Sequence, residues 1–256
     1  MKYQNRERAE GFGLFARQYD KTRPSYSKGL IEWLSVNEIG NAIDVGCGTG
    51  QVATLLSKAG WKVIAIEPDE RMAKIARSHH VKVIVSKFEQ WTPKNKDFDL
   101  ITAGTSWHWI DPKVGYDKAA SILKPGGRLA IFRNFYNYEA KVTTIIAHTL
   151  KQFAPKLLKE CVPLGIGDQN QTDSHVNQVE NRKDLFARYE IRVFQHDRVV
   201  PIDIWIEELT THSPIYLLEK SISNKLLTEL AEKVESVVGD NIKITHDTYC
   251  LLVWKH

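Results

Sequence analysis

Apolar and polar residues alternate in blocks along the first half of the chain. Short apolar runs predict buried strands at residues 41–46, 62–67, 81–86, 97–103 and 128–133. Apolar residues at helical spacing predict helices between them, at 51–59, 69–79 and 112–123. Strands of this kind, separated by helices of about ten residues, imply right-handed crossovers and a parallel sheet.

The second half of the chain is less regular. Helical patterns cover 140–158, 201–212 and 224–238, and alternating patterns predict strands at 189–200 and 242–254. The stretch 165–181 is strongly polar and is predicted to be a loop. No internal repeat and no linker divides the chain, so the pattern favours one doubly wound α/β domain with an insertion at about 135–190.

Composition narrows the class of protein. Of the 256 residues, 43% are hydrophobic and 26% are charged, which excludes a largely disordered chain. The net charge is +4, from 35 Lys and Arg against 31 Asp and Glu, and this mild excess requires neither a nucleic-acid nor a membrane partner. The first residues lack a signal-peptide pattern, and no window approaches about 18 uninterrupted apolar residues.

The cysteines point to a compartment. Cys47, Cys161 and Cys250 are odd in number, far apart and outside any metal-ligand spacing. They predict neither a disulfide framework nor a metal site, and a reducing cytoplasm fits them best.

A glycine-rich loop follows the first predicted strand and opens a helix. It reads Asp44-Val45-Gly46-Cys47-Gly48-Thr49-Gly50, with the spacing D-x-G-x-G-x-G. Glycines there let the backbone approach a ligand, and the following helix N-terminus favours a negative group such as a carboxylate. A P-loop would end in Gly-Lys-Ser/Thr, and a dinucleotide fingerprint would need glycine where Gln51 stands. A tight strand-to-helix turn without a ligand remains an alternative.

An acidic residue ends the second strand. Glu67 could accept hydrogen bonds from both hydroxyls of a ribose lying across the crevice, or it could be a solvated strand end. Met72, one turn into the next helix, could pack on an adenine ring or in the core.

Four segments together resemble the class I S-adenosylmethionine-dependent methyltransferases. They are Ile43 to Gly50 (IDVGCGTG), Ile66 to Pro68, Phe98 to Ala103 (FDLITA) and Leu123 to Gly127 (LKPGG). Residues 15–26, 106–111 and 249–255 resemble a small-molecule branch, methyltransferase type 11, which includes trans-aconitate methyltransferase-like proteins. The resemblance implies a seven-stranded, mostly parallel sheet with an antiparallel last strand and a helical insertion.

From these patterns together with the resemblance, we expect the single domain 1–256 to divide into four parts. An N-terminal helical cover spans 1–35, the cofactor-binding core 36–134, the insertion 135–190, and the last part of the sheet 191–256.

S-adenosylmethionine is the cofactor that the resemblance implies. Asp44, Gly46, Gly48 and Gly50 would cradle its methionine part, and Glu67 would hold the ribose. The residues implied for the adenine, the sulfonium side and the cover are Met72, Phe88, Glu89, Gly104, Thr105 and Tyr19. Lys87 departs from the acidic residue that many members carry there.

Methyl transfer from a sulfonium is an in-line displacement that chiefly requires positioning. His108 could be a general base or a wall residue beside Trp107 and Trp109. Arg133 could clamp a substrate carboxylate or be a solvated strand end. Arg23 and Tyr216 are assigned to the substrate side with the two tryptophans.

The expected protein is a cytoplasmic methyltransferase, a monomer or homodimer, acting on a small carboxylate or other polar metabolite. The alternatives are a cofactor-binding module without turnover and a methyltransferase acting on RNA or protein.

Overall fold

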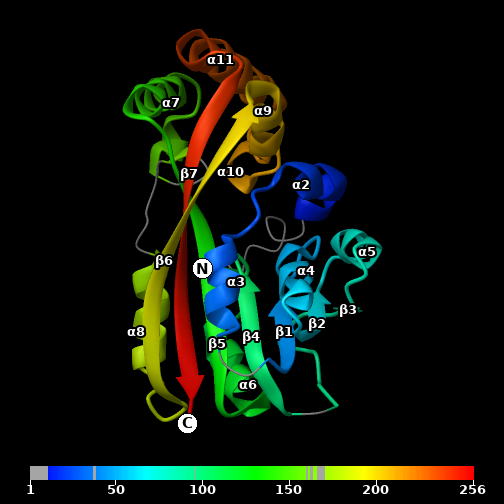
Figure 1. Cartoon of the computed structure of the whole chain (residues 1–256). Helices are drawn as coiled ribbons and strands as arrows, with labels where there is room; N and C mark the ends of the chain where they lie inside the picture. Colours follow the sequence, from blue (N-terminus) through cyan, green and yellow to red (C-terminus); the bar gives the residue numbers. More distant parts are fainter. Residues whose placement is uncertain (1–10, 37–38, 95, 160, 162–163, 166–170) are drawn as a thin grey trace.

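A computed structural model describes residues 11–36, 39–94, 96–159, 161, 164–165 and 171–256. Its strands form one sheet in the order β3-β2-β1-β4-β5-β7-β6 (Figure 1). The strands are β1 Asn41–Val45, β2 Lys62–Glu67, β3 Val83–Val85, β4 Phe98–Gly104, β5 Leu123–Asn137, β6 Phe186–Pro201 and β7 Asn241–Lys255. Only β7 runs antiparallel to its neighbours, which confirms the fold class expected from the sequence.

Helices cover both faces of the sheet. The α-helices are α2 Ala16–Thr22, α3 Lys28–Leu34, α4 Gln51–Lys58, α5 Glu70–Ser78, α6 Pro112–Ile122, α7 Ala140–Phe153, α8 Gln171–Glu180, α9 Ile202–Thr210, α10 Ser213–Tyr216 and α11 Lys220–Val238. Short 3-10 helices lie at η2 Gly11–Phe15, η3 Trp107–Trp109 and η4 Pro155–Lys159. Among these described helices, none is both long and apolar enough to cross a membrane.

Alternation along the strands divides the core between the two faces. On β1, Ile43 packs with α6 and α8, while Ala42 packs with α3 and α4. A further core lies where β6 and β7 reach past the parallel strands (Figure 1). There Val200, Ile242 and Ile244 pack against α7, α9 and α11. This second core places α9 and α10 beside the carboxyl ends of the parallel strands.

The prediction of a loop at 165–181 is wrong over most of that stretch. Residues Gln171–Glu180 form α8, while 166–170 lie outside the described residues. Val176 and Val179 pack on the same core as Leu251 and Val253 of β7. Two apolar positions in ten are too few to signal a helix, and the contact with the sheet stabilises it.

Some element ends also differ. β5 begins at Leu123, so the Lys-Pro-Gly-Gly segment that follows the predicted helix 112–123 is part of the strand, which continues to Asn137. Pairing with the equally long β7 supports this extension over its last residues.

Candidate functional site

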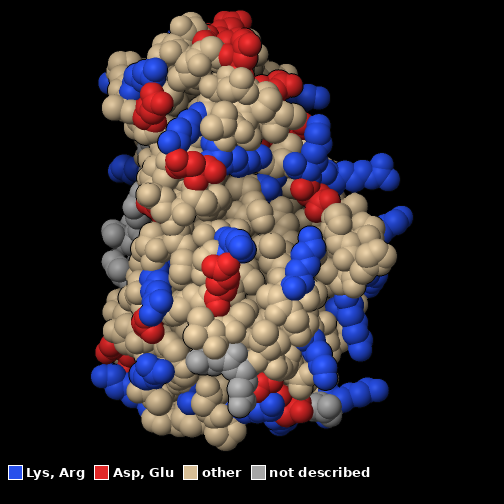
Figure 2. All heavy atoms as spheres, viewed as in Figure 1, with Lys and Arg blue, Asp and Glu red and all other residues tan. Residues whose placement is uncertain are grey.

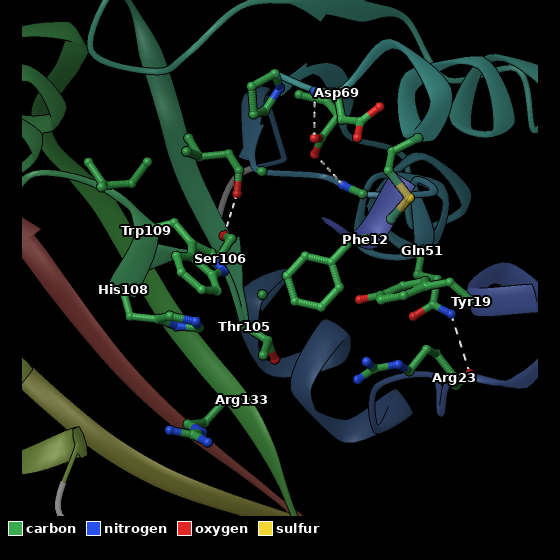
Figure 3. Close-up of a pocket in the computed structure, with 18 of the residues that line it drawn as sticks. Phe12, Tyr19, Arg23, Gln51, Asp69, Thr105, Ser106, His108, Trp109 and Arg133 are labelled. Atoms are coloured by element: carbon green, nitrogen blue, oxygen red, sulfur yellow. Dashed lines mark hydrogen bonds between the residues drawn. The ribbon is translucent and has the colours of Figure 1, made fainter. Parts of the chain in front are cut away.

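A cavity of about 220 Å³ lies at the carboxyl ends of β1, β2, β4 and β5. The N-terminal cover, η2 and α2, closes one side, and the segment between α9 and α10 contributes another part of the wall. Figure 3 shows Phe12 pointing into the space between Tyr19 and Trp109. Its ring meets theirs edge-on, at 6.3 and 6.1 Å between centroids.

The glycine loop forms one wall of the cavity. Gly46 and Gly48 line it, both with left-handed backbone (φ +64° and +56°). A Cβ on Gly46 would stand 2.6 Å from the Cβ of Ser106, so only glycine fits there. Gly50 does not line the cavity: its left-handed turn (φ +88°) begins α4, and a Cβ would meet Ala76 at 3.0 Å.

Asp44 lies behind the loop rather than in the cavity wall. It is 1% exposed, and its carboxylate accepts hydrogen bonds from the Ala53 N–H (3.1 Å) and the Thr102 hydroxyl (2.9 Å). Burial raises its pKa to about 7, although both bonds oppose the shift. The carboxylate therefore ties the loop to the first turn of α4 and to β4.

Glu67 is held at the end of β2 with both oxygens oriented. Oε2 accepts the N–H of Gly48 (2.8 Å) and Oε1 accepts that of Asp69 (3.0 Å). The side chain lines the cavity, and burial raises its pKa to about 7 against these two bonds. Each carboxylate oxygen has a second acceptor position, so Glu67 can still accept hydrogen bonds from two hydroxyl groups.

The residues expected beside an adenine come together on the same half of the cavity. Met72, Phe88 and Glu89 all line it, and Met72 and Phe88 are almost fully buried. Glu89 is fixed by the N–H of Asp111, 3.0 Å from its Oε1. Lys87 also lines this half.

The end of β4 is strained and crowded. Thr105 has left-handed backbone (φ +55°), which is uncommon for a non-glycine residue. Its N–H donates to the carbonyl of Phe132 (2.7 Å), and its hydroxyl lies 3.0 Å from that of Tyr26. A Cβ on Gly104 would come within 2.8 Å of the same Tyr26 oxygen. Strain of this kind gathers at functional sites, and Tyr26 was not singled out from the sequence.

The cover is fastened across the cavity by Arg23. Its Nε and Nη2 donate to the hydroxyl and carbonyl of Thr211, each at 2.9 Å. Its guanidinium also lies 4.5 Å from the centre of the Tyr19 ring. Both Tyr19 and Arg23 line the cavity, as the resemblance implies.

Of the residues expected at the substrate, His108, Trp109 and Arg133 line the cavity. Trp107 does not. It is 3% exposed, packs against Phe88 and Tyr116 in the core, and lines a smaller adjoining cavity. Tyr216 also lies outside the lining. The Tyr216 ring instead packs edge-on against the ring of Phe12, which lines the cavity.

A buried acid–base pair lies at the acceptor end, and the sequence analysis did not pair its two residues. Nε2 of His212, which lines the cavity, lies 3.6 Å from Oε1 of the fully buried Glu208. The other Glu208 oxygen lies 2.5 Å from Nη1 of Arg198. Burial lowers the pKa of His212 to about 3, so its imidazole is neutral. Although burial raises the pKa of Glu208, the contacts with His212 and Arg198 hold it below its ordinary value. In the sequence, the signal for the pair is the i, i+4 spacing of its members within the predicted helix 201–212, although in the structure α9 ends at Thr210 and His212 follows it.

Charge divides the cavity. Its carboxylates, on Glu67, Asp69 and Glu89, lie on the half beside β2 and β3. Its guanidiniums, on Arg23 and Arg133, lie on the other half with His108 and His212. Lys87 departs from this division, because its ammonium group lies on the same half as the carboxylates. The first half suits hydroxyl and amino donors, whereas the second suits an anion.

The comparisons with known proteins agree with this geometry. Residues 43–131, which carry the glycine loop, Glu67 and the β4 end, match the family model described as a methyltransferase domain. This stretch is a methyltransferase domain. It covers the four segments on which the sequence resemblance rests.

Curated relatives match over the same half of the chain. An uncharacterized methyltransferase of Mycobacterium tuberculosis is 30% identical over 131 residues, covering 50% of this chain and 54% of the relative. The malonyl-[acyl-carrier protein] O-methyltransferase of Hahella chejuensis is 29% identical over 131 residues, 47% of each chain. The chain thus spans about half the length of these relatives.

Solved structures share the fold over nearly the whole chain. A candidate type II methyltransferase from Anaeromyxobacter dehalogenans matches with a TM-score of 0.71 and 19% identity, covering 90% of this chain and 97% of that one. A phosphoethanolamine N-methyltransferase of Haemonchus contortus, solved with S-adenosylhomocysteine, matches with a TM-score of 0.53 and 14% identity, covering 97% and 58%. These likenesses show the methyltransferase fold.

Proposed function

We propose that this protein transfers a methyl group from S-adenosylmethionine to a small anionic acceptor. The observation that carries the proposal is the division of charge within one cavity: carboxylates beside β2 and β3, guanidiniums beside β5 and the cover. A methyltransferase domain supplies the first half. Residues from outside that domain supply most of the second.

The residues of the first half fit the cofactor. Glu67 has acceptor positions for both ribose hydroxyls, and Gly46 and Gly48 present bare backbone to the cavity. Met72 and Phe88 offer apolar contacts for the adenine. When bound, the cofactor supplies an activated methyl group, so the chain's task is to orient the acceptor and exclude water.

At the acceptor half, Arg133 and Arg23 would bind a carboxylate of the acceptor. For an acceptor atom that carries a proton, His108 and His212 are the groups that could take it. His212 is neutral, and Glu208 behind it would stabilise the imidazolium that forms. An acceptor carboxylate needs no such step. The malonyl-[acyl-carrier protein] relative supports an acceptor with an anionic group.

A small acceptor is favoured over RNA by the position of the cavity beneath the N-terminal cover and by the charges on the surface. On the face in Figure 2, acidic side chains lie among the basic ones rather than leaving a continuous basic stripe. The buried cysteines suit a reducing compartment, and we place the reaction in the cytoplasm.

The decisive experiment is calorimetric titration with S-adenosylmethionine, S-adenosylhomocysteine and NAD. We expect micromolar binding of the first two and none of the third, followed by turnover in a screen that begins with small carboxylic acids. Cofactor binding without turnover of any small acid, protein or RNA would favour a binding module instead. Failure to bind either methionine cofactor would refute the proposal.

A further inference from the structure

Strand β6 is the edge of the sheet farthest from β3 (Figure 1). It runs for 16 residues, and among the described residues its only strand neighbour is β7. All its residues except Phe186 and Val200 are exposed or half-buried. An open edge of this length presents a row of backbone N–H and C=O groups that another strand can pair with.

The middle of β6 carries charged side chains on one face but neither a proline nor a bulge. Charged side chains, Pro and bulges are devices with which soluble proteins block such edges. β6 contains no Lys, its one Pro is its last residue, and its register shift lies at its start, between Phe186 and Arg188. Tyr189, Ile191 and Val193 follow one another on one face and are 38%, 39% and 56% exposed. They form an apolar stripe beside the open edge.

The opposite face carries charges that are held in place. Arg192 Nε lies 2.6 Å from Oε1 of Glu190, and its guanidinium lies 4.7 Å from the Trp33 ring centre. Arg188 lies 4.0 Å from the ring centre of Trp254 in the same way. Both guanidiniums are thus oriented before any partner arrives.

We propose that β6 is a homodimer interface, in which two copies pair antiparallel about a two-fold axis at Ile191. In this register Glu190 lies opposite Arg192 of the second copy, and the reverse pair forms across the axis. On the other face Tyr189 lies opposite Val193, and the two Ile191 side chains meet. Opposite charges and apolar pairs across strands each stabilise a sheet.

Charge selects this register over its neighbours. An axis at Glu190 would set two carboxylates opposite each other, and an axis at Arg192 would set two guanidiniums together. Like charges directly opposite are destabilising. Strand addition gains main-chain hydrogen bonds, but one strand pair buries less than the roughly 1,200 Å² of a stable interface. The dimer should therefore dissociate on dilution.

Sedimentation velocity over a range of concentrations tests the proposal. The wild type should move from monomer to dimer as concentration rises. Glu190→Arg and Arg192→Glu should each remain monomeric, because like charges then face each other, while an equimolar mixture of the two should dimerise again. Circular dichroism melting confirms that both variants fold. A wild type that is monomeric at every concentration, or single variants that dimerise like it, would overturn the proposal.

A cross-link tests the axis itself. Two copies of Ile191→Cys should form a covalent dimer under mild oxidation, since their thiols meet at the axis. Val199→Cys is the matched control: Val199 is 65% exposed on the same strand, but its two copies would lie roughly 50 Å apart. The native cysteines are buried, so the wild type should not cross-link. Equal cross-linking of both variants would show that the register is wrong.

Discussion

The two halves of the cavity are built in different ways. The cofactor half comes from one continuous stretch, from the glycine loop to the end of β4, and its contacts rely heavily on backbone groups. The acceptor half comes from side chains far apart in sequence: Arg23 in the cover, Arg133 on β5 and His212 after α9. A site built from one continuous segment has a sequence motif by which it can be recognised. A site built from side chains that are far apart in sequence has no such motif.

The largest expected effect lies in the cofactor half. Glu67→Ala should weaken S-adenosylhomocysteine binding by about 100-fold, since it removes two hydrogen bonds to a charged acceptor. Affinity in the wild type should also fall as pH drops through about 7, because Glu67 then takes up a proton. Calorimetry measures both. The exposed Glu70→Ala is the control, and unchanged affinity in Glu67→Ala would remove the ribose assignment.

Next comes the acid–base pair of the acceptor half. With an acceptor that carries a proton on the reacting atom, His212→Gln should lower kcat by about 100-fold. The affinity of this variant for S-adenosylhomocysteine should stay unchanged, which would show that the acceptor half contributes to turnover independently of cofactor binding. His108→Gln is the matched comparison. If only the His108 variant loses kcat, the proton acceptor is His108.

Arg133→Met should act on acceptor affinity alone. Loss of a bidentate contact should raise the acceptor KM by about 10-fold to 100-fold, with little change in kcat or cofactor binding. Initial rates at saturating S-adenosylmethionine measure this. An unchanged KM would move the anion site to Arg23.

The buried Asp44 predicts a pH-dependent stability in the cofactor half. Its pKa rises from 3.8 in the unfolded chain to about 7 in the folded protein. The contribution of its protonated form to the free energy of unfolding is therefore fully present below pH 3.8 and is lost as pH rises through 7. Asp44→Asn, neutral throughout, should therefore gain on the wild type by about 2 kcal/mol between pH 5 and pH 8. Urea unfolding of both proteins at each pH measures this difference. A pH-independent difference would mean that Asp44 keeps an ordinary pKa.

The smallest effect should come from Tyr26, where the cover touches β4. Tyr26→Phe removes the hydroxyl contact with Thr105 but keeps the ring against Phe132. We expect a loss of about 1 kcal/mol in stability and a few-fold drop in kcat, since one neutral hydrogen bond is lost. Thermal unfolding and initial rates measure the two. A larger fall in kcat than in stability would show that Thr105 must be held for transfer.

The sequence by itself determined the parallel core, the position of the glycine loop and the place of Glu67. Each follows from local patterns: buried strands are apolar runs, the loop needs left-handed glycines, and Glu67 stands at the end of the second apolar run. The sequence could not show that Gly46 lines the cavity while Gly50 does not. Both glycines have left-handed backbone, and only the packing of Gly50 on Ala76 distinguishes them.

Tertiary structure alone decided the rest. Trp107 and Trp109 are two residues apart, yet the short η3 turn sends one into the core and the other into the cavity. α8 exists because β7 covers its two valines. Glu208 and His212 became a buried pair because the far ends of β6 and β7 carry a second core that brings α9 to the cavity. Such placements depend on contacts between distant segments, and the free energy of those contacts is not encoded in any local pattern.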